Sequence, residues 1–321
     1  MKTRRRIWLV SLVSLTLACS GEDSRSADTS DAAQDDSQSQ ATPQPIQVFL
    51  MAGQSNMVGY GPLTDADTGD WPESMSLGAM IESGTASAAL LQTRDDVWVH
   101  FQSDDNVQTP GLLEPGFGAD TSFFGPELGF GEVLGEALDT PLVLFKSATG
   151  GTTLGSDWRP PAAVQRAGGV VGPLYTNMFS GFSSFLETNL SETFPADYAD
   201  RGFEIAGFIW LQGWNDQFED GFVAAYEENL VDLVEDVRRQ LALPRLPVLI
   251  VEGPTLDQAL RDARIAALSR LEEETPGCQA LVETNDLVNI EVEGNFHFNF
   301  NAGNYLEVGR RMARALLEEA P

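Results

Sequence analysis

The chain has 321 residues, and its 48 acidic and 19 basic side chains give a formal net charge of −29. This balance argues against a nucleic-acid-binding protein, which needs a basic face to replace phosphate counterions. Two cysteines are too few for a disulfide framework or a cysteine-rich zinc site, and two histidines exclude a three-histidine metal site. Any histidine-dependent catalysis must therefore use His100 or His297.

The N-terminus predicts a signal peptide over residues 1–18. Four basic residues precede an apolar run that is too short to span a bilayer as a mature helix. The four residues before Cys19 read Leu-Thr-Leu-Ala and resemble a bacterial lipobox, which predicts lipidation of Cys19. The alternative is an ordinary signal peptide that is cut nearby. We therefore expect an exported protein, either an outer-membrane or cell-surface lipoprotein or a periplasmic or secreted one.

Residues 19–45 predict a disordered acidic linker. From residue 20 onward this segment holds no aromatic residue and no aliphatic residue larger than alanine. It cannot bury enough apolar surface to offset the entropy of ordering, so we expect a tether to the lipid anchor. Without the leader, the chain has 48 acidic and 15 basic residues and a net charge of −33. Residues 46–321 contain 42 acidic and 14 basic residues and so carry −28 of this charge. This negative charge favours a neutral or cationic substrate over a polyanion.

Five short apolar runs between residue 46 and the C-terminus predict the strands of a parallel sheet. Continuous apolar runs, as opposed to alternating ones, indicate strands that are buried on both faces. Most of the runs end in glycine-containing turns. The runs are residues 46–51, 141–145, 203–211, 247–251 and, more weakly, 280–282.

Amphipathic stretches between these runs predict helices. Phe222, Tyr226, Leu230 and Val234, for example, recur at every fourth position and lie on one helical face. Strands that alternate with helices predict a single α/β domain over residues 46–321. Residues 60–124 predict a long insertion that walls the site, with an alternating strand around His100. The predicted helices cover residues 128–138, 175–186, 222–241, 256–271 and 305–317.

Candidate chemistry lies at the carboxyl ends of the predicted strands, where open α/β sheets bind their ligands. These ends hold residues 53–57, 149–152 and 212–216, which are rich in glycine and amide side chains. Ser55 is a candidate nucleophile there, and it needs a base. His297 precedes the last helix and lies at the same edge. A serine in such a turn is more often a helix cap and a loop histidine more often structural, but their joint placement favours chemistry.

The block GQSNM at residues 53–57 resembles the first block of the SGNH/GDSL hydrolase superfamily. More narrowly, it resembles the sialate O-acetylesterase and carbohydrate esterase family six branch. The resemblance continues through residues 125–128, 150–152, 210–216 and the His297 block, and covers most of residues 46–318. It implies a flavodoxin-like, three-layer α/β/α sandwich with a central parallel sheet, a serine nucleophile and neither metal nor other cofactor.

The resemblance also implies roles for particular residues. Ser55 would be the nucleophile and His297 the base. The oxyanion donors would be the backbone amides of Ser55 and Gly151 and a side-chain amide, either that of Gln212 or that of Asn215. Substrate contacts are expected from Gln54, Asn56, Thr152 and Trp214.

One position departs from the pattern of many members, which carry an aspartate three residues before the histidine. Gly294 occupies that position here, and Glu293 is one residue earlier. Either Glu293 reaches His297 to orient it, or Ser55 and His297 form a dyad that a backbone carbonyl steadies. Loss of the orienting acid can cost orders of magnitude in rate.

The leading hypothesis is an exported carbohydrate O-acetylesterase that acts on acetylated sugars through an acetyl-Ser55 intermediate. A non-catalytic surface carbohydrate-binding protein on the same fold is the alternative from another class, motivated by Gly294 and the tether. A related lipase or thioesterase is a third possibility. No nucleic-acid partner and no membrane contact beyond the lipid anchor are expected, and the sequence does not determine the oligomeric state.

Overall fold

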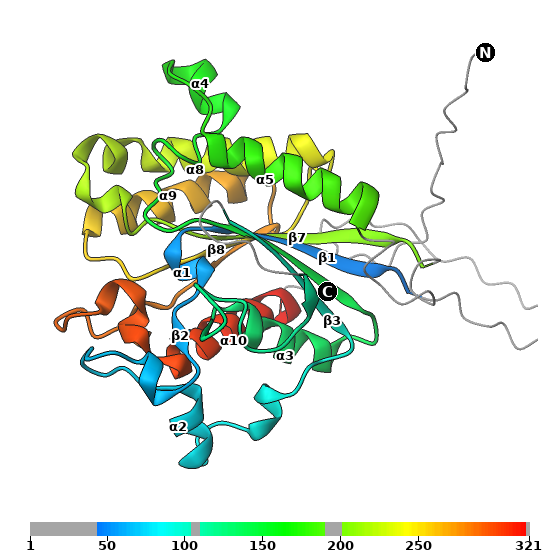
Figure 1. The fold of residues 1–321 in the computed structure, drawn as a ribbon. Coiled ribbons are helices and arrows are strands. Elements are labelled where there is room, and N and C mark those ends of the chain that lie inside the picture. Colours follow the sequence, from blue (N-terminus) through cyan, green and yellow to red (C-terminus); the bar gives the residue numbers. More distant parts are fainter. Residues whose placement is uncertain (1–43, 104–109, 190–200, 319–321) are drawn as a thin grey trace, which may run out of the picture.

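The computed structural model describes residues 44–103, 110–189 and 201–318 of the chain (Figure 1). The predicted signal peptide, Cys19 and nearly all of the predicted linker lie outside the described residues, so these predictions stay predictions. No helix among the described residues combines the length and the hydrophobicity that crossing a membrane requires.

The described part of the chain is organised around a seven-stranded sheet with the order β4-β3-β6-β1-β7-β8-β9. All neighbouring strands run parallel except β3 and β4. All five predicted strands form, and they follow the order β6-β1-β7-β8-β9, which is the flavodoxin-like order 2-1-3-4-5. The strands are β1 (Ile46–Gly53), β3 (Val97–Gln102), β4 (Gly111–Leu112), β6 (Leu142–Ala148), β7 (Phe203–Leu211), β8 (Val248–Val251) and β9 (Gln279–Val282).

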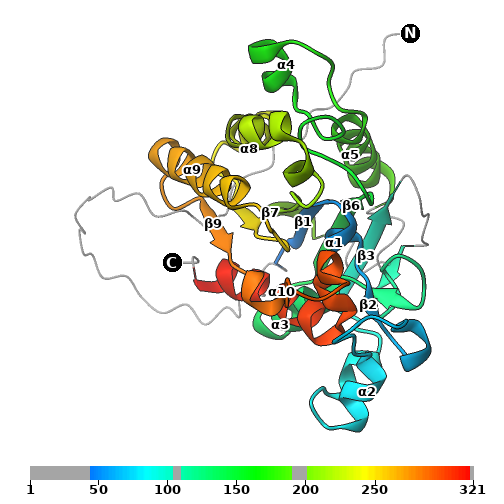
Figure 2. The ribbon, with the colours of Figure 1, turned by 90° about the vertical axis from the view of Figure 1, so that its left-hand side faces the viewer.

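Helices cover both faces of this sheet. The helices α5 (Pro173–Ser184), α8 (Asp220–Leu241) and α9 (Gln258–Glu274) lie on one face (Figures 1 and 2). The helices α3 (Glu127–Ala137) and α10 (Ala302–Glu318) pack against each other on the opposite face. All five predicted helices are therefore present. The short helix α4 (Pro161–Ala167), which packs on α8, was not predicted because its two turns carry too few apolar residues to show a period.

The side chains of β1 alternate between two hydrophobic cores. Val48 and Leu50 pack in the core beneath α5, α8 and α9, whereas Phe49 and Met51 pack in the core beneath α3 and α10. All four are buried, which explains why the strand reads as a continuous apolar run. The structure thus confirms the predicted three-layer α/β/α sandwich.

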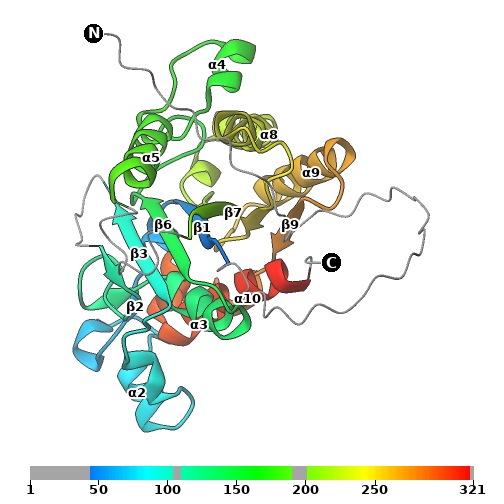
Figure 3. The same cartoon turned by 90° about the vertical axis from the view of Figure 1, so that its right-hand side faces the viewer.

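The predicted insertion after β1 adds strands as well as loops. β3 pairs in parallel with β6 and extends the sheet beyond the five predicted strands (Figure 3). Its side chains alternate between buried and half-buried, which confirms the alternating strand predicted around His100. The insertion also holds β2 (Gly61–Pro62), β5 (Phe123–Phe124) and α2 (Leu77–Glu82). Its residue Met75 pairs with Asn301, so the insertion is joined to the segment that carries His297.

Candidate active site

Ser55 lies where the chain turns from the central strand into the short helix α1 (Ser55–Val58). This turn requires Gly53, because a Cβ added there would lie only 2.1 Å from the carbonyl oxygen of Leu211 in the neighbouring strand. The Ser55 side chain is 6% exposed. None of the hydrogen bonds among the described residues uses its hydroxyl, so the group is available to a ligand or a base.

The segment that carries His297 packs against α1. It forms the 3₁₀ helix η6 (Asn295–Phe300), and Nδ2 of Asn56 donates to the carbonyl oxygen of Phe296 at 3.0 Å. The structure therefore links the neighbour of Ser55 to the neighbour of His297. No hydrogen bond joins the side chains of Ser55 and His297 themselves among the described residues.

The backbone after His297 adopts an uncommon conformation. Phe298, Asn299 and Phe300 have φ values of 47°, 58° and 49°, in the left-handed region that side chains other than glycine rarely enter. Asn299 holds this turn, because its Oδ1 accepts from the backbone N–H of Asn289 at 3.0 Å and its Nδ2 donates to the carbonyl oxygen of Asn289 at 3.1 Å. Strain of this kind tends to be retained where function requires a particular geometry.

The predicted orienting acid does not reach His297. Glu293 is exposed, whereas Nδ1 of His297 is buried without a hydrogen-bond partner among the described residues. The alternative that a backbone carbonyl steadies the ring fails for the same reason. Burial lowers the pKa of His297 from 6.5 to about 3, and no nearby carboxylate offsets this effect. The imidazole is therefore neutral, as a general base must be, over most of the acidic range.

The turn after β6 borders Ser55. A Cβ added to Gly150 would lie 3.8 Å from the Cβ of Ser55. The next residue, Gly151, is exposed and has a φ of +72°, which favours glycine. Gly151 therefore follows the residue that borders Ser55 and has its backbone at the surface, as the predicted oxyanion donor would require.

The two candidate side-chain donors, Gln212 and Asn215, differ in what their amides already bind. Gln212 is buried, and its Nε2 donates to Gln54 Oε1 at 3.2 Å, to the carbonyl oxygen of Thr152 at 3.0 Å and to the carboxylate of Asp216. Asn215 is half-buried and accepts from Nε2 of Gln54 at 2.7 Å through its Oδ1. No hydrogen bond among the described residues uses its Nδ2. Asn215 is therefore the one of the two whose amide hydrogens remain available.

Three of the residues expected to contact substrate make hydrogen bonds within the chain. Gln54 Oε1 accepts from the backbone N–H of Gly213 at 3.0 Å, and Asn56 Oδ1 accepts from the hydroxyl of Tyr305 at 3.2 Å. The Thr152 hydroxyl donates to the carbonyl oxygen of Thr149 at 2.8 Å. All three side chains are more than nine-tenths buried. These hydrogen bonds hold the side chains of Gln54, Asn56 and Thr152 in place, and their contact with substrate stays a prediction.

Trp214 is the expected substrate contact that does reach the surface. Its ring is half-buried and lies 5.6 Å from the ring of Phe218, which is 61% exposed. Its ring also lies 6.1 Å from the ring of Phe296, the neighbour of His297. The rings of Trp214, Phe218 and Phe296 therefore form an apolar rim beside His297.

Sequence reasoning missed a buried ion pair beneath α1. Nζ of Lys146 donates to Oε2 of Glu127 at 2.8 Å and to the carbonyl oxygen of Val58 at 2.9 Å, and both charged side chains are fully buried. Val58 is the last residue of α1, so the pair fixes the helix that begins with Ser55. The pKa of Lys146 is lowered by burial, and Glu127 opposes this effect. The sequence feature that could have indicated this ion pair is the single lysine within the otherwise apolar strand β6.

The loop after β7 carries a second buried acid, Asp216. It accepts from the backbone N–H groups of Leu154 at 3.1 Å and Gly155 at 3.0 Å, and from Gln212. Burial raises its pKa, and these hydrogen bonds oppose the shift. Asp216 therefore ties the segment after Gly151 to the loop of Asn215.

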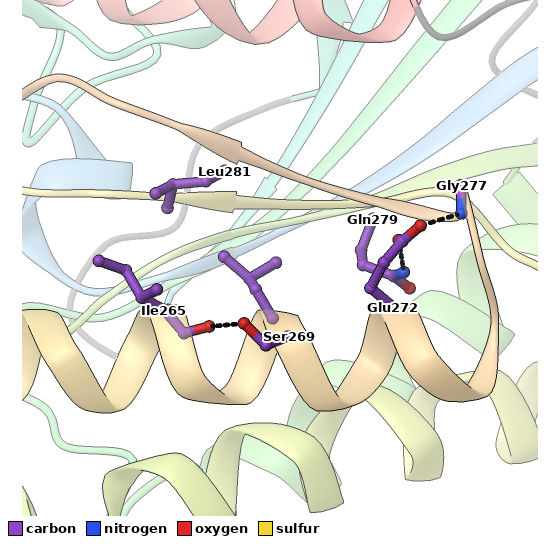
Figure 4. A pocket seen from close by; sticks show the side chains of 7 residues that line it. Ile265, Ser269, Glu272, Gly277, Gln279 and Leu281 are labelled. Atoms are coloured by element: carbon purple, nitrogen blue, oxygen red, sulfur yellow. Dashed lines mark hydrogen bonds between the residues drawn. The ribbon is translucent and has the colours of Figure 1, made fainter.

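The structure also has a hollow that lies apart from this site. A hollow of about 450 Å³ lies between α9 and β9 (Figure 4), and it contains none of the candidate catalytic residues. Within the described ranges, no cluster of three histidine, cysteine, aspartate or glutamate side chains is arranged to hold a metal ion. The hollow is lined by Ile265, Leu268, Ser269, Glu272, Gly277, Gln279 and Leu281.

Comparison with known proteins identifies the family. Residues 45–318 match the model of a family described as carbohydrate esterase, sialic acid-specific acetylesterase. The chain belongs to this carbohydrate esterase family. The match spans the whole described domain, including every block on which the resemblance was based.

Solved structures with the same fold are distant in sequence. A protein from Arabidopsis thaliana matches with a TM-score of 0.58 and 19% identity, covering 86% of this chain and 100% of its own. A carbohydrate acetylesterase from Xanthomonas citri matches with a TM-score of 0.53 and 16% identity, covering 85% of this chain and 56% of its own. At these identities the matches establish the fold alone. No curated protein matches the chain significantly.

Proposed function

We propose that this member of the family is an exported carbohydrate O-acetylesterase that uses Ser55 as its nucleophile. The observation that carries the proposal is the convergence of three strand ends. Ser55, the Gly150–Gly151 turn and Asn215 follow β1, β6 and β7, and the His297 segment is hydrogen-bonded to α1 beside them.

The reaction would proceed in two steps. The Ser55 hydroxyl attacks the acetyl carbonyl carbon while His297 takes its proton, and the sugar alcohol then leaves with that proton. Water, activated by the same histidine, attacks acetyl-Ser55, and acetate is released with the serine restored. The backbone amides of Ser55 and Gly151 and the Nδ2 of Asn215 would stabilise the negative charge on the carbonyl oxygen.

The surroundings of the site favour a neutral acetylated sugar as substrate. The rings of Trp214 and Phe218 lie 5.6 Å apart and are inclined by 72°. Trp214 is half-buried and Phe218 is 61% exposed, so both rings are accessible enough to pack against a sugar. The acidic balance of residues 46–321 disfavours a polyanionic glycan. We therefore infer that acetylated neutral polysaccharides are better substrates than sialylated glycans.

The decisive measurement is acetate release from acetylated xylan, from acetylated sialic acid and from an aryl acetate. We expect turnover by the wild type and a loss of at least about 10³-fold in Ser55→Ala. Covalent labelling of Ser55 by a fluorophosphonate would give independent support. Wild type and Ser55→Ala that are equally inactive on all three substrates would refute the proposal.

The same assays separate the alternatives. Retention of glycans without turnover, unaffected by Ser55→Ala, would support a carbohydrate-binding protein. A preference for longer acyl chains over acetyl would support a lipase or thioesterase. In either case the fold assignment would stand while the proposed activity would fall.

Export by lipidation of Cys19 is a separate proposal that rests on the lipobox-like residues before it. Labelled palmitate supplied to bacteria that express the full chain should be incorporated into the wild type and not into Cys19→Ser. Secretion of an unlabelled wild type would indicate an ordinary signal peptide instead.

A further inference from the structure

The imidazole of His297 is held by aromatic rings and not by a carboxylate. The ring of Tyr60 stacks on it, with centroids 3.9 Å apart and planes inclined by 8°. The ring of Phe300 lies at 5.0 Å in an edge-to-face arrangement inclined by 78°, and that of Phe296 lies at 4.6 Å and 61°. These three contacts fix the plane of the imidazole from different directions. The Nδ1 atom, which an orienting acid would bind, has no hydrogen-bond partner among the described residues.

Tyr60 is itself held in a fixed relation to the nucleophile. It follows α1 directly after Gly59, whose backbone N–H donates to the carbonyl oxygen of Ser55 at 2.9 Å. The hydroxyl of Tyr305, which donates to Asn56, also interacts with the backbone N–H of Tyr60. The stacked ring is therefore attached to the same short turn that presents Ser55.

Electrostatics gives the stacked ring a second effect. When Ser55 attacks, His297 takes its proton and becomes an imidazolium in a half-buried position. The face of an aromatic ring carries partial negative charge and attracts a cation that lies over it. The Tyr60 face is the nearest ring surface parallel to His297, so it favours the charged imidazole where no carboxylate does.

We propose that Tyr60 is a positioning residue that replaces the orienting acid, because its stacked ring fixes the His297 plane and stabilises the imidazolium formed during the reaction. This inference rests on the proposed function. It accounts for how a histidine with glycine at the usual aspartate position can still act as a base. It predicts that the aromatic ring of Tyr60, and not its hydroxyl, carries the effect.

The test compares Tyr60→Leu with Tyr60→Phe in the full chain, on an aryl acetate. We expect kcat to fall about tenfold in Tyr60→Leu with less than a twofold change in KM, and to be retained in Tyr60→Phe. Phe123→Leu is the matched control, because Phe123 contacts Tyr60 at 5.8 Å and makes no ring contact with His297. We expect this variant to retain kcat.

A spectroscopic measurement separates stacking from general damage. The ring protons of His297, assigned in NMR spectra by their absence in His297→Asn, should move downfield in Tyr60→Leu as the ring current is lost. They should stay in place in Tyr60→Phe and in Phe123→Leu.

Specific outcomes would overturn the inference. An unchanged kcat in Tyr60→Leu would do so, as would an equal loss in Tyr60→Phe or in Phe123→Leu. Each of these leaves the proposed esterase activity standing, since the wild type is active in all three. An inactive wild type would instead refute the proposed function and this inference together.

Discussion

The amide side chains of Gln212 and Asn215 occupy the same loop but have different surroundings. The family resemblance implies either of them as the side-chain oxyanion donor. Only the hydrogen bonds separate them: the amide nitrogen of Gln212 is committed to three internal acceptors, whereas that of Asn215 is not. A choice that depends on where a side-chain nitrogen points cannot be made from the order of residues.

Replacing each amide by alanine should therefore have different consequences. Asn215→Ala should lower kcat by about 10²-fold to 10³-fold, because an oxyanion donor acts on the transition state. It should also lower Tm, because the buried Nε2 of Gln54 loses its acceptor. Gln212→Ala should lower the free energy of unfolding by about 1–3 kcal/mol, because the buried carboxylate of Asp216 loses a donor. Kinetics on an aryl acetate and thermal unfolding check both. A normal kcat in Asn215→Ala would contradict the assignment.

His297 should also make stability depend on pH. Its pKa is lowered by burial to about 3 in the folded state, against about 6.5 in the unfolded chain. Below pH 6.5 the unfolded chain therefore binds a proton that the folded one does not, so the free energy of unfolding falls as pH falls. The slope approaches about 1.4 kcal/mol per pH unit well below pH 6.5.

Urea unfolding at pH 7.5, 6.5, 5.5 and 5.0 measures this dependence. His297→Gln, which does not titrate, should lose less stability than the wild type between pH 6.5 and 5.0. The pKa of His100 is lowered by burial as well, so His100→Gln is the matched control and should remove a separate part of the slope. Parallel curves for wild type and His297→Gln would show that His297 titrates normally.

At the scale of elements, the hydrophobic periodicity of the chain predicts the helices and strands. It does not predict which strands pair with each other. Continuous apolar runs identify five strands of the central sheet, because those strands are buried on both faces. Apolar residues at four-residue spacings identify five helices, because each helix buries one face. The roles of Tyr60 and Lys146 could not be predicted, because they arise from contacts with segments that are distant in the sequence. The pairing of β3 with β6 could not be predicted for the same reason. The residues of a strand inside an insertion do not indicate which edge of the sheet the strand joins.

The buried pair of Lys146 and Glu127 gives α1 its fixed position, and single replacements should release it. Glu127→Gln or Lys146→Met should each lower the free energy of unfolding by about 3–5 kcal/mol, because one buried charge is left without its partner. The double variant Lys146→Met with Glu127→Gln should lose less than the sum of the two. Urea unfolding of all four proteins gives the coupling. Additive losses would show that the two charges do not depend on each other.

At the scale of the whole molecule, charge is the property that bears on substrate choice. Residues 46–321 carry a balance of −28, and the aromatic rim beside His297 adds no basic group. Family membership alone does not decide between a sialylated and a neutral substrate. We expect the negative charge of the domain to distinguish them, because it should repel an anionic glycan and leave a neutral one unaffected.

Ionic strength should therefore affect the two substrate classes differently. Raising it from about 0.01 M to about 0.15 M shortens the screening length from about 30 Å to about 8 Å. We expect kcat/KM to rise for acetylated sialic acid, because repulsion of its carboxylate is screened, and to change little for a neutral acetylated xylo-oligosaccharide. The methyl ester of the same acetylated sialic acid is the matched control and should show the neutral behaviour. Equal salt responses for the acid and its ester would mean that the charge of the domain does not reach the site.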